Sequence, residues 1–150
     1  MTITRPYSLV VNHQKDKVHL EMRCNFSLTN TSRFVDIGFF IKSFVPSVFK
    51  TRCFNKTNLP FKKEVLHTEL GHFFEHILLD QLCALTVEQR KNLRYRGLTK
   101  WNWTKEKKGI FHIYIDGRFL DKYSFNTALK NSKFIFNKLI SSSYPLSQFQ

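Results

Sequence analysis

The stretch from Leu66 to Leu85 reads LHTELGHFFEHILLDQLCAL and predicts the central helix of the fold. Successive residues of an α-helix are about 100° apart around its axis, so His72, Glu75 and His76 share one flank. Apolar residues cover the opposite side: Leu70, Phe73, Phe74, Ile77, Leu78, Ala84 and Leu85. This amphipathic pattern is typical of a helix that packs on a hydrophobic core.

His72, Glu75 and His76 have the spacing His-x-x-Glu-His, the inverted form of a zinc-peptidase signature. Histidines four residues apart can bind one metal ion, and Glu75 is the expected general base that takes a proton from a zinc-activated water. Asp80, one turn after His76, is placed to orient an imidazole. The alternative is a solvated polar face that carries two histidines. The alignment of all three groups opposite an apolar face favours zinc and the hydrolysis of amide or ester bonds.

A catalytic zinc takes three protein ligands and keeps one position open. Asp116 is the first choice for the third metal ligand, because it ends a predicted strand whose polar face also carries Tyr114 and His112. Tyr114 is the candidate donor of a hydrogen bond to a developing oxyanion. Glu69 and His112 remain as alternative ligands. The alternative role of Asp116 is that of an ordinary turn residue before Gly117.

The chain has 150 residues, of which 42% are hydrophobic and 16 are Phe, so one phenylalanine-rich domain over residues 1–150 is expected. The remaining patterns predict strands at 7–11, 18–26 and 110–116, helices at 34–44 and 123–140, an irregular basic segment at 47–63, a basic surface segment at 86–96, a Lys-rich segment with two tryptophans at 97–109, and a flexible tail at 141–150. These elements predict an α/β (α+β) domain, in which about three helices pack on an antiparallel or mixed sheet.

A formal net charge of +13 predicts an acidic partner, such as a peptide, a polyanionic polymer or nucleic acid. Trp101 and Trp103 in the Lys-rich segment, with Arg94 and Arg96 before it, are the candidate substrate-binding residues. The alternative to substrate binding is that both tryptophans fill the edge of the hydrophobic core. No nucleic-acid-binding motif accompanies the charge. The alternative function is a non-catalytic module that binds an acidic polymer, a partner protein or nucleic acid through this basic, Trp-containing face.

The sequence has no apolar run near 18 residues, which predicts no membrane-spanning helix, and residues 1–6 have no apolar core of a signal peptide. Three widely spaced cysteines (Cys24, Cys53 and Cys83) favour a reducing compartment, so a cytoplasmic location is expected. Phosphate-binding, dinucleotide-binding and serine-nucleophile motifs are absent, which leaves kinase, oxidoreductase and serine-hydrolase functions without support.

Several short segments extend the pattern around the motif: Phe40-Ile41-Lys42, Val45-Pro46, Cys53, the run from Leu70 to Leu79, Gly97-Leu98-Thr99 and the run from Gly109 to Asp116. Together they resemble the N-terminal domain of cyanophycin synthetases. The resemblance implies a mixed α/β module that handles a substrate polymer and, in some members, carries a metallopeptidase-like site. It implies His72, His76 and Asp116 as metal ligands and Glu75 as base. Asp116 stands where that family has Glu, and the family's ligase modules are absent, so we expect no polymer synthesis by this chain.

Overall fold

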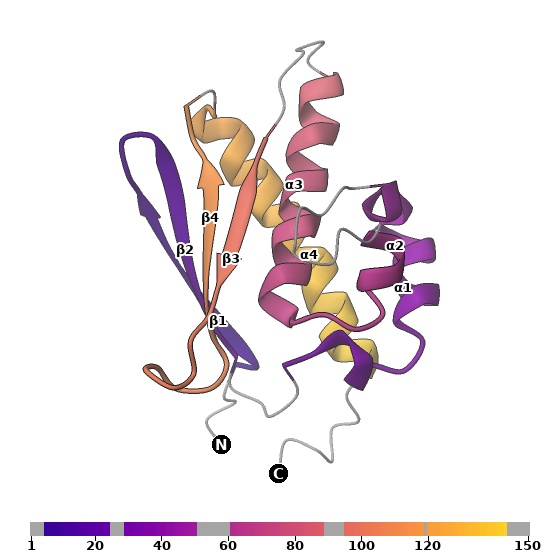
Figure 1. Ribbon diagram of the computed structural model, residues 1–150. Coiled ribbons are helices and arrows are strands. Elements are labelled where there is room, and N and C mark those ends of the chain that lie inside the picture. The colour runs from indigo at the N-terminus through magenta and orange to yellow at the C-terminus, as the bar shows by residue number, and fades with distance from the viewer. Residues whose placement is uncertain (1–4, 25–28, 51–60, 89–94, 119, 144–150) are drawn as a thin grey trace.

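The helix predicted around His72 is α3 (Leu70–Glu88), and it lies against one face of a four-stranded antiparallel sheet (Figure 1). The computed structural model describes residues 5–24, 29–50, 61–88, 95–118 and 120–143. Its strands are β1 (Tyr7–His13), β2 (Lys17–Cys24), β3 (Gly97–Lys100) and β4 (Ile110–Asp116), in the spatial order β1-β2-β4-β3. The other helices are α1 (Ile37–Phe44), α2 (Phe61–Glu64) and α4 (Lys122–Ser143). The predicted α+β class is confirmed.

Period-two patterns give the sheet two different faces. The inner face, which α3 and α4 cover, carries buried apolar side chains from the two central strands: Val18, Leu20, Met22, Phe111, Ile113 and Ile115. The outer face carries the alternating polar side chains, and His19 pairs across the strands with Tyr114. This division decides which of the predicted site residues can meet.

The core is rich in phenylalanine, as the composition predicts. Its fully buried aromatic side chains come from α2, α3, β4 and α4: Phe61, Phe73, Phe74, Phe111, Phe125 and Phe136. The first turn of α3 approaches β4 so closely that a Cβ atom on Gly71 would lie 2.3 Å from Cγ of Phe111. Only glycine fits at this contact, which brings the first turn of α3 close to the inner face of the sheet.

Three segments differ from the expectations. The Lys-rich segment begins with strand β3, whose four residues pair with β4; such a short strand between a basic stretch and a turn carries little periodicity. The segment 47–63 contains the end of a 3₁₀ turn (Pro46–Lys50) and the start of α2, while residues 51–60 lie outside the described part. Helix α1 begins three residues later than predicted, because Asp36 before it has a left-handed backbone with φ of 59°.

Among the helices in the described ranges, none combines the length and the apolar character needed to cross a membrane. Cys24 is a buried free thiol and Cys83 an exposed one, and Cys53 lies outside the described residues. Of the predicted tail, residues 141–143 continue α4 and the rest is likewise not described.

Candidate functional site

His72 and His76 point their Nε2 atoms at each other from successive turns of α3, with 3.1 Å between them. Thr68, just before the helix, places its Oγ1 2.8 Å from Nδ1 of His72. On the other side, the ring of Phe61 in α2 stacks on the imidazole of His76, with 3.6 Å between centroids and 10° between planes. Thr68 therefore holds the ring of His72, and Phe61 holds the ring of His76.

This geometry fits two ligands of one zinc ion. At Zn–N bonds of about 2.0–2.1 Å, two nitrogens of a tetrahedral site lie about 3.3 Å apart, close to the spacing of the two Nε2 atoms. The hydrogen bond between Nδ1 of His72 and Oγ1 of Thr68 is the kind of outer contact that orients a metal-binding imidazole. Burial lowers the pKa of His72 and lowers that of His76 to about 3, so both rings are neutral, as metal ligands must be.

Glu75 lies on the same helix but turns toward the edge strand β3. It is buried, and Thr99 donates a hydrogen bond of 2.5 Å from Oγ1 to its Oε2. A Cβ atom on Gly97 would lie 2.8 Å from Oε1, so the glycine makes room for the carboxylate. Burial raises the pKa of Glu75 to about 7, against the lowering effect of the Thr99 bond. A carboxylate that titrates near neutrality is suited to accept a proton.

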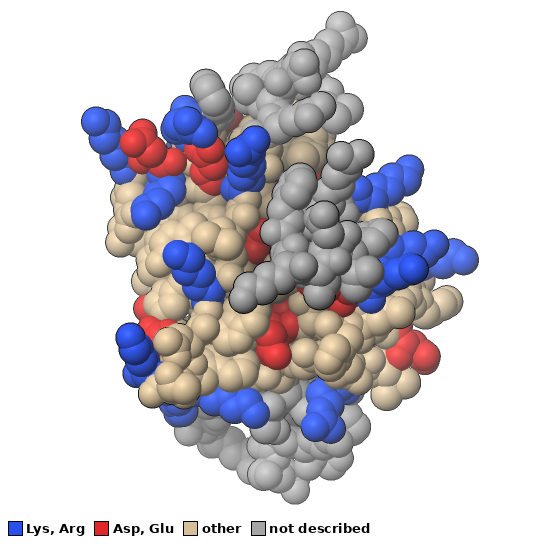
Figure 2. Space-filling view, in the orientation of Figure 1, with Lys and Arg blue, Asp and Glu red and all other residues tan. Residues whose placement is uncertain are grey.

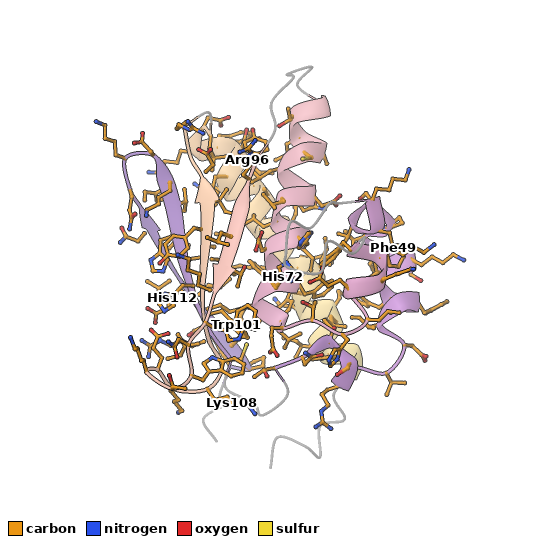
Figure 3. All side chains as sticks on the ribbon, in the orientation of Figure 1. Phe49, His72, Arg96, Trp101, Lys108 and His112 are labelled. Carbon is orange, nitrogen blue, oxygen red and sulfur yellow. The ribbon has the colours of Figure 1, made fainter. Side chains whose placement is uncertain are left out.

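The structure does not bring Asp116, Tyr114 or His112 to this pair. All three extend from the outer face of β4, whereas α3 packs on the inner face, and Figure 3 shows His72 and His112 on different sides of the sheet. Asp116 instead accepts hydrogen bonds from Arg118, with 2.7 Å from Nη2 to Oδ2, which lowers the pKa of the carboxyl. The expectation of Asp116 as third ligand and of Tyr114 as oxyanion donor is therefore corrected, because an alternating strand directs them away from α3.

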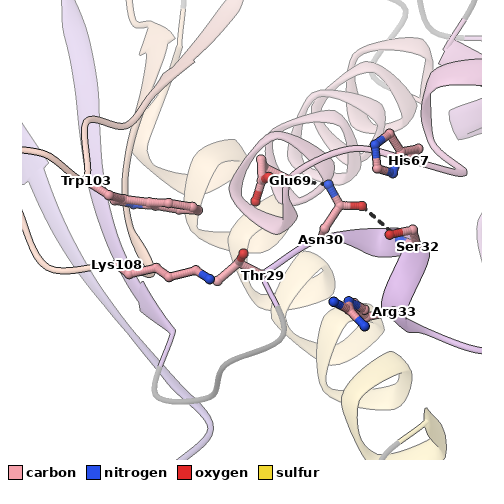
Figure 4. Close-up of a pocket in the computed structure, with 8 residues that line it drawn as sticks. All are labelled: Thr29, Asn30, Ser32, Arg33, His67, Glu69, Trp103 and Lys108. Atoms are coloured by element: carbon pink, nitrogen blue, oxygen red, sulfur yellow. Dashed lines mark hydrogen bonds between the residues drawn. The ribbon is translucent and has the colours of Figure 1, made fainter.

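Glu69 also turns away from the histidines. Its Oε1 accepts a bond of 3.3 Å from Nδ2 of Asn30, and it lines a pocket of about 500 Å³ (Figure 4). Arg33 and Lys108 lie at the same pocket. Asp80 accepts a hydrogen bond of 2.9 Å from Oγ of Ser47, which joins α3 to the 3₁₀ turn.

One carboxylate that the sequence reasoning missed lies nearer the pair. Glu64 ends α2, three residues after Phe61, and its charge acts on His72 so as to raise the pKa of the imidazole. Within the described residues, however, no three His, Cys, Asp or Glu side chains form a cluster that could hold a metal ion. The sequence signal for this carboxylate is the spacing of Phe61 and Glu64, which lie one helical turn apart and so extend from the same side of α2.

Of the candidate substrate-binding residues, Trp101 and Trp103 lie close together, with 6.4 Å between their ring centroids. Trp103 is half-buried, donates a hydrogen bond of 3.0 Å from Nε1 to the carbonyl oxygen of Ile110 and packs on Phe111. Its role is therefore to stabilise the start of strand β4. Trp101 is 41% exposed. Arg96 is exposed just before β3, and Arg94 lies outside the described residues.

Comparison of the sequence with protein-family models and with curated proteins gave no match. The chemistry of the site therefore rests on the side chains of this chain.

Proposed function

We propose that this protein is a zinc-dependent hydrolase of peptide or isopeptide bonds. The observation that carries the proposal is the convergence of two neutral imidazoles, whose Nε2 atoms lie 3.1 Å apart on α3. His72 and His76 would hold the ion, and zinc bound there would supply Lewis-acid activation of water and of the substrate carbonyl. The resemblance to the N-terminal domain of cyanophycin synthetases supports the same class of substrate, and a cytoplasmic setting is part of the proposal.

The other residues of the site have separate roles. Glu75 would accept the proton of the attacking water, because its buried carboxylate, held by Thr99, titrates near neutrality. Phe61 would exclude water from one side of the pair and keep the imidazole of His76 in its orientation.

Glu64 is our candidate for the third ligand in place of Asp116. It is carried by α2, the same short helix that brings Phe61 onto His76, and its charge already acts on His72. Glu64 does not form a three-residue cluster with the two histidines in this structure, so its side chain would have to turn toward the ion. Two histidines and one carboxylate are a ligand set of catalytic zinc sites. Exchange of Glu64 for Gln is expected to weaken zinc binding, whereas exchange of Asp116 for Asn is expected to leave it unchanged.

A cleavage assay tests this function. The zinc-loaded protein is incubated with a peptide library that includes isopeptide bonds, and the products are identified by mass spectrometry. Glu75→Gln is expected to reduce cleavage about 10²- to 10⁴-fold while zinc stays bound. Glu106→Gln, on the outer face, is the matched control and is expected to cleave normally. Cleavage that persists in Glu75→Gln, or no cleavage by the zinc-loaded protein, would sink the proposal.

A further inference from the structure

A second hollow lies outside the histidine site, at the exposed edge of the sheet. It has a volume of about 870 Å³ and runs from the loop after β3 onto the outer face of β4. Its lining includes two aromatic rings, Trp101 and Tyr114, and two ammonium groups, Lys100 and Lys105. The hydrolase proposed above does not use these side chains.

Trp101 offers a fixed ring with free surface. Its indole packs at a steep angle on Phe111, with 5.7 Å between centroids and 68° between planes, and lies 6.4 Å from the ring of Trp103. These contacts hold the ring in place, yet the residue is 41% exposed and it lines the hollow. A rigid, exposed indole is suited to stack on a planar ligand, because little side-chain entropy is lost on binding.

Positive charge surrounds the second ring. The ammonium groups of Lys17 and Lys100, on the two strands that flank β4, lie 5.1 Å and 6.0 Å from the ring centroid of Tyr114. Figure 2 shows Lys and Arg side chains on the left of the molecule, over the sheet of Figure 1, with Asp and Glu side chains among them at the upper left and uncharged surface between them lower down. The hollow thus combines exposed aromatic surface with several ammonium groups.

Two acidic residues of this face are paired with guanidinium groups, Glu21 with Arg23 and Asp116 with Arg118. Glu106, which lines the hollow, contacts the imidazole of His112 and is one carboxylate beside the ammonium groups of Lys100 and Lys105. In the described ranges, the ion pairs on this face do not involve Lys17, Lys100 or Lys105. Their charge is available for an anionic partner, in agreement with the net charge of +13.

We propose that this hollow binds single-stranded nucleic acid. A base stacks on Trp101, while phosphates of the same strand lie against Lys100, Lys105 and Lys17. An acidic peptide would use the lysines but has no general need of the exposed indole. A duplex would use them too, but its bases are stacked on each other and cannot reach Trp101. The combination of ring and charge therefore favours a single strand.

Fluorescence anisotropy of labelled 12-nucleotide oligo-dT and oligo-U tests the proposal. Trp101→Ala is expected to weaken binding about 5- to 150-fold, the range for the loss of one stacked base. The double variant Lys100→Glu/Lys105→Glu retains Trp101 and is expected to lower the slope of log affinity against log salt by about 1.4, for two lost phosphate contacts. Binding is also expected to quench tryptophan fluorescence in the wild type.

Matched controls make the test specific. Lys130→Glu/Lys133→Glu changes the charge by the same amount on exposed positions of α4 and is expected to alter affinity less than twofold. His72→Ala is expected to bind the oligonucleotides normally, which separates this site from the hydrolase. The proposal is overturned if neither oligonucleotide binds at low salt, if the α4 variant loses as much affinity as the hollow variant, or if duplex DNA or polyglutamate binds as tightly and with the same dependence on Trp101.

Discussion

The protein contains two histidine pairs in hydrogen-bonding contact, one on each side of the sheet. His72 and His76 meet at 3.1 Å on α3, under the ring of Phe61. His19 and His112 meet at 2.9 Å across neighbouring strands of the outer face, where both are partly exposed. The distance between the two contacting nitrogens is nearly the same in both pairs, but the other ring nitrogens have different hydrogen-bond partners.

In the outer pair, His112 uses both ring nitrogens. Its Nε2 contacts Oε1 of Glu106 at 2.7 Å, so Nδ1 is left as the acceptor for His19. In the inner pair, Nδ1 of His72 contacts Thr68, and both Nε2 atoms face each other. The outer arrangement is a hydrogen-bonded chain that ends on a carboxylate, whereas in the inner one two Nε2 atoms share one contact, where a metal ion would replace the proton between them. Proximity of two histidines is therefore not enough for a metal site, because the second nitrogen of each ring decides what the first can bind.

The largest effect on stability is expected from Phe61→Ala. This fully buried ring stacks on His76, so its removal leaves a cavity beside the inner pair and is expected to lower the free energy of unfolding by about 3–5 kcal/mol. Phe39→Ala on α1, where the side chain is 73% exposed, is the control and is expected to change it by less than about 0.5 kcal/mol. Urea unfolding measures both. Equal losses would show that the inner pair is not packed as described.

A smaller effect is expected from Gly97→Ala, which places a methyl group against the carboxylate of Glu75. Because that carboxylate is buried and held by Thr99, we expect a loss of about 1–3 kcal/mol and reduced cleavage. Gly38→Ala in α1 meets only ordinary contact at 3.6 Å and is expected to stabilise the helix by up to about 1 kcal/mol. A neutral result at position 97 would contradict the placement of Glu75.

The smallest effect is a change of stability with pH in the metal-free protein. Burial lowers the pKa of both inner histidines, so the unfolded chain binds protons below pH 6.5 that the folded chain does not, and acid destabilises the fold. The pKa of Glu75 is raised from 4.5 to about 7, so its contribution has the opposite sign and is lost as the pH rises through this range. Between pH 6.5 and pH 5 the contributions of His76 and Glu75 are similar in size and opposite in sign, so the lowered pKa of His72 decides the net direction.

We therefore expect a net loss of stability between pH 6.5 and pH 5, measured from urea midpoints. Glu75→Gln removes the opposing contribution and is expected to make the dependence steeper. A midpoint that rises on acidification, or a shallower dependence in Glu75→Gln, would mean that these groups do not have the environments described.

The sequence predicted those features that depend on local periodicity. The amphipathic pattern of α3 identified the face shared by His72, Glu75 and His76, and the alternation in β4 was read correctly. The same alternation argues against Asp116 as a metal ligand, because it places Asp116 on the face of β4 opposite Phe111. Phe111 lies on the face that α3 covers. Which face α3 would cover follows from the burial of that apolar set.

Other features depend on long-range packing, for which the sequence holds little signal. Strand β3 forms because β4 offers it a partner, and its Thr99 then reaches Glu75, 24 residues earlier. The contact of Phe61 with His76 likewise joins a four-residue helix to the next one. Short elements of this kind are defined by tertiary contacts and not by their own propensity.

Zinc content after equilibrium dialysis tests the central claim most directly. We predict one bound zinc per chain in the wild type and in the double variant His19→Ala/His112→Ala, which removes the outer pair. His72→Ala and His76→Ala are predicted to lose the ion, with a weakening of more than about 100-fold. Zinc that stays bound without His72 or His76, or that is lost with the outer pair, would contradict the account.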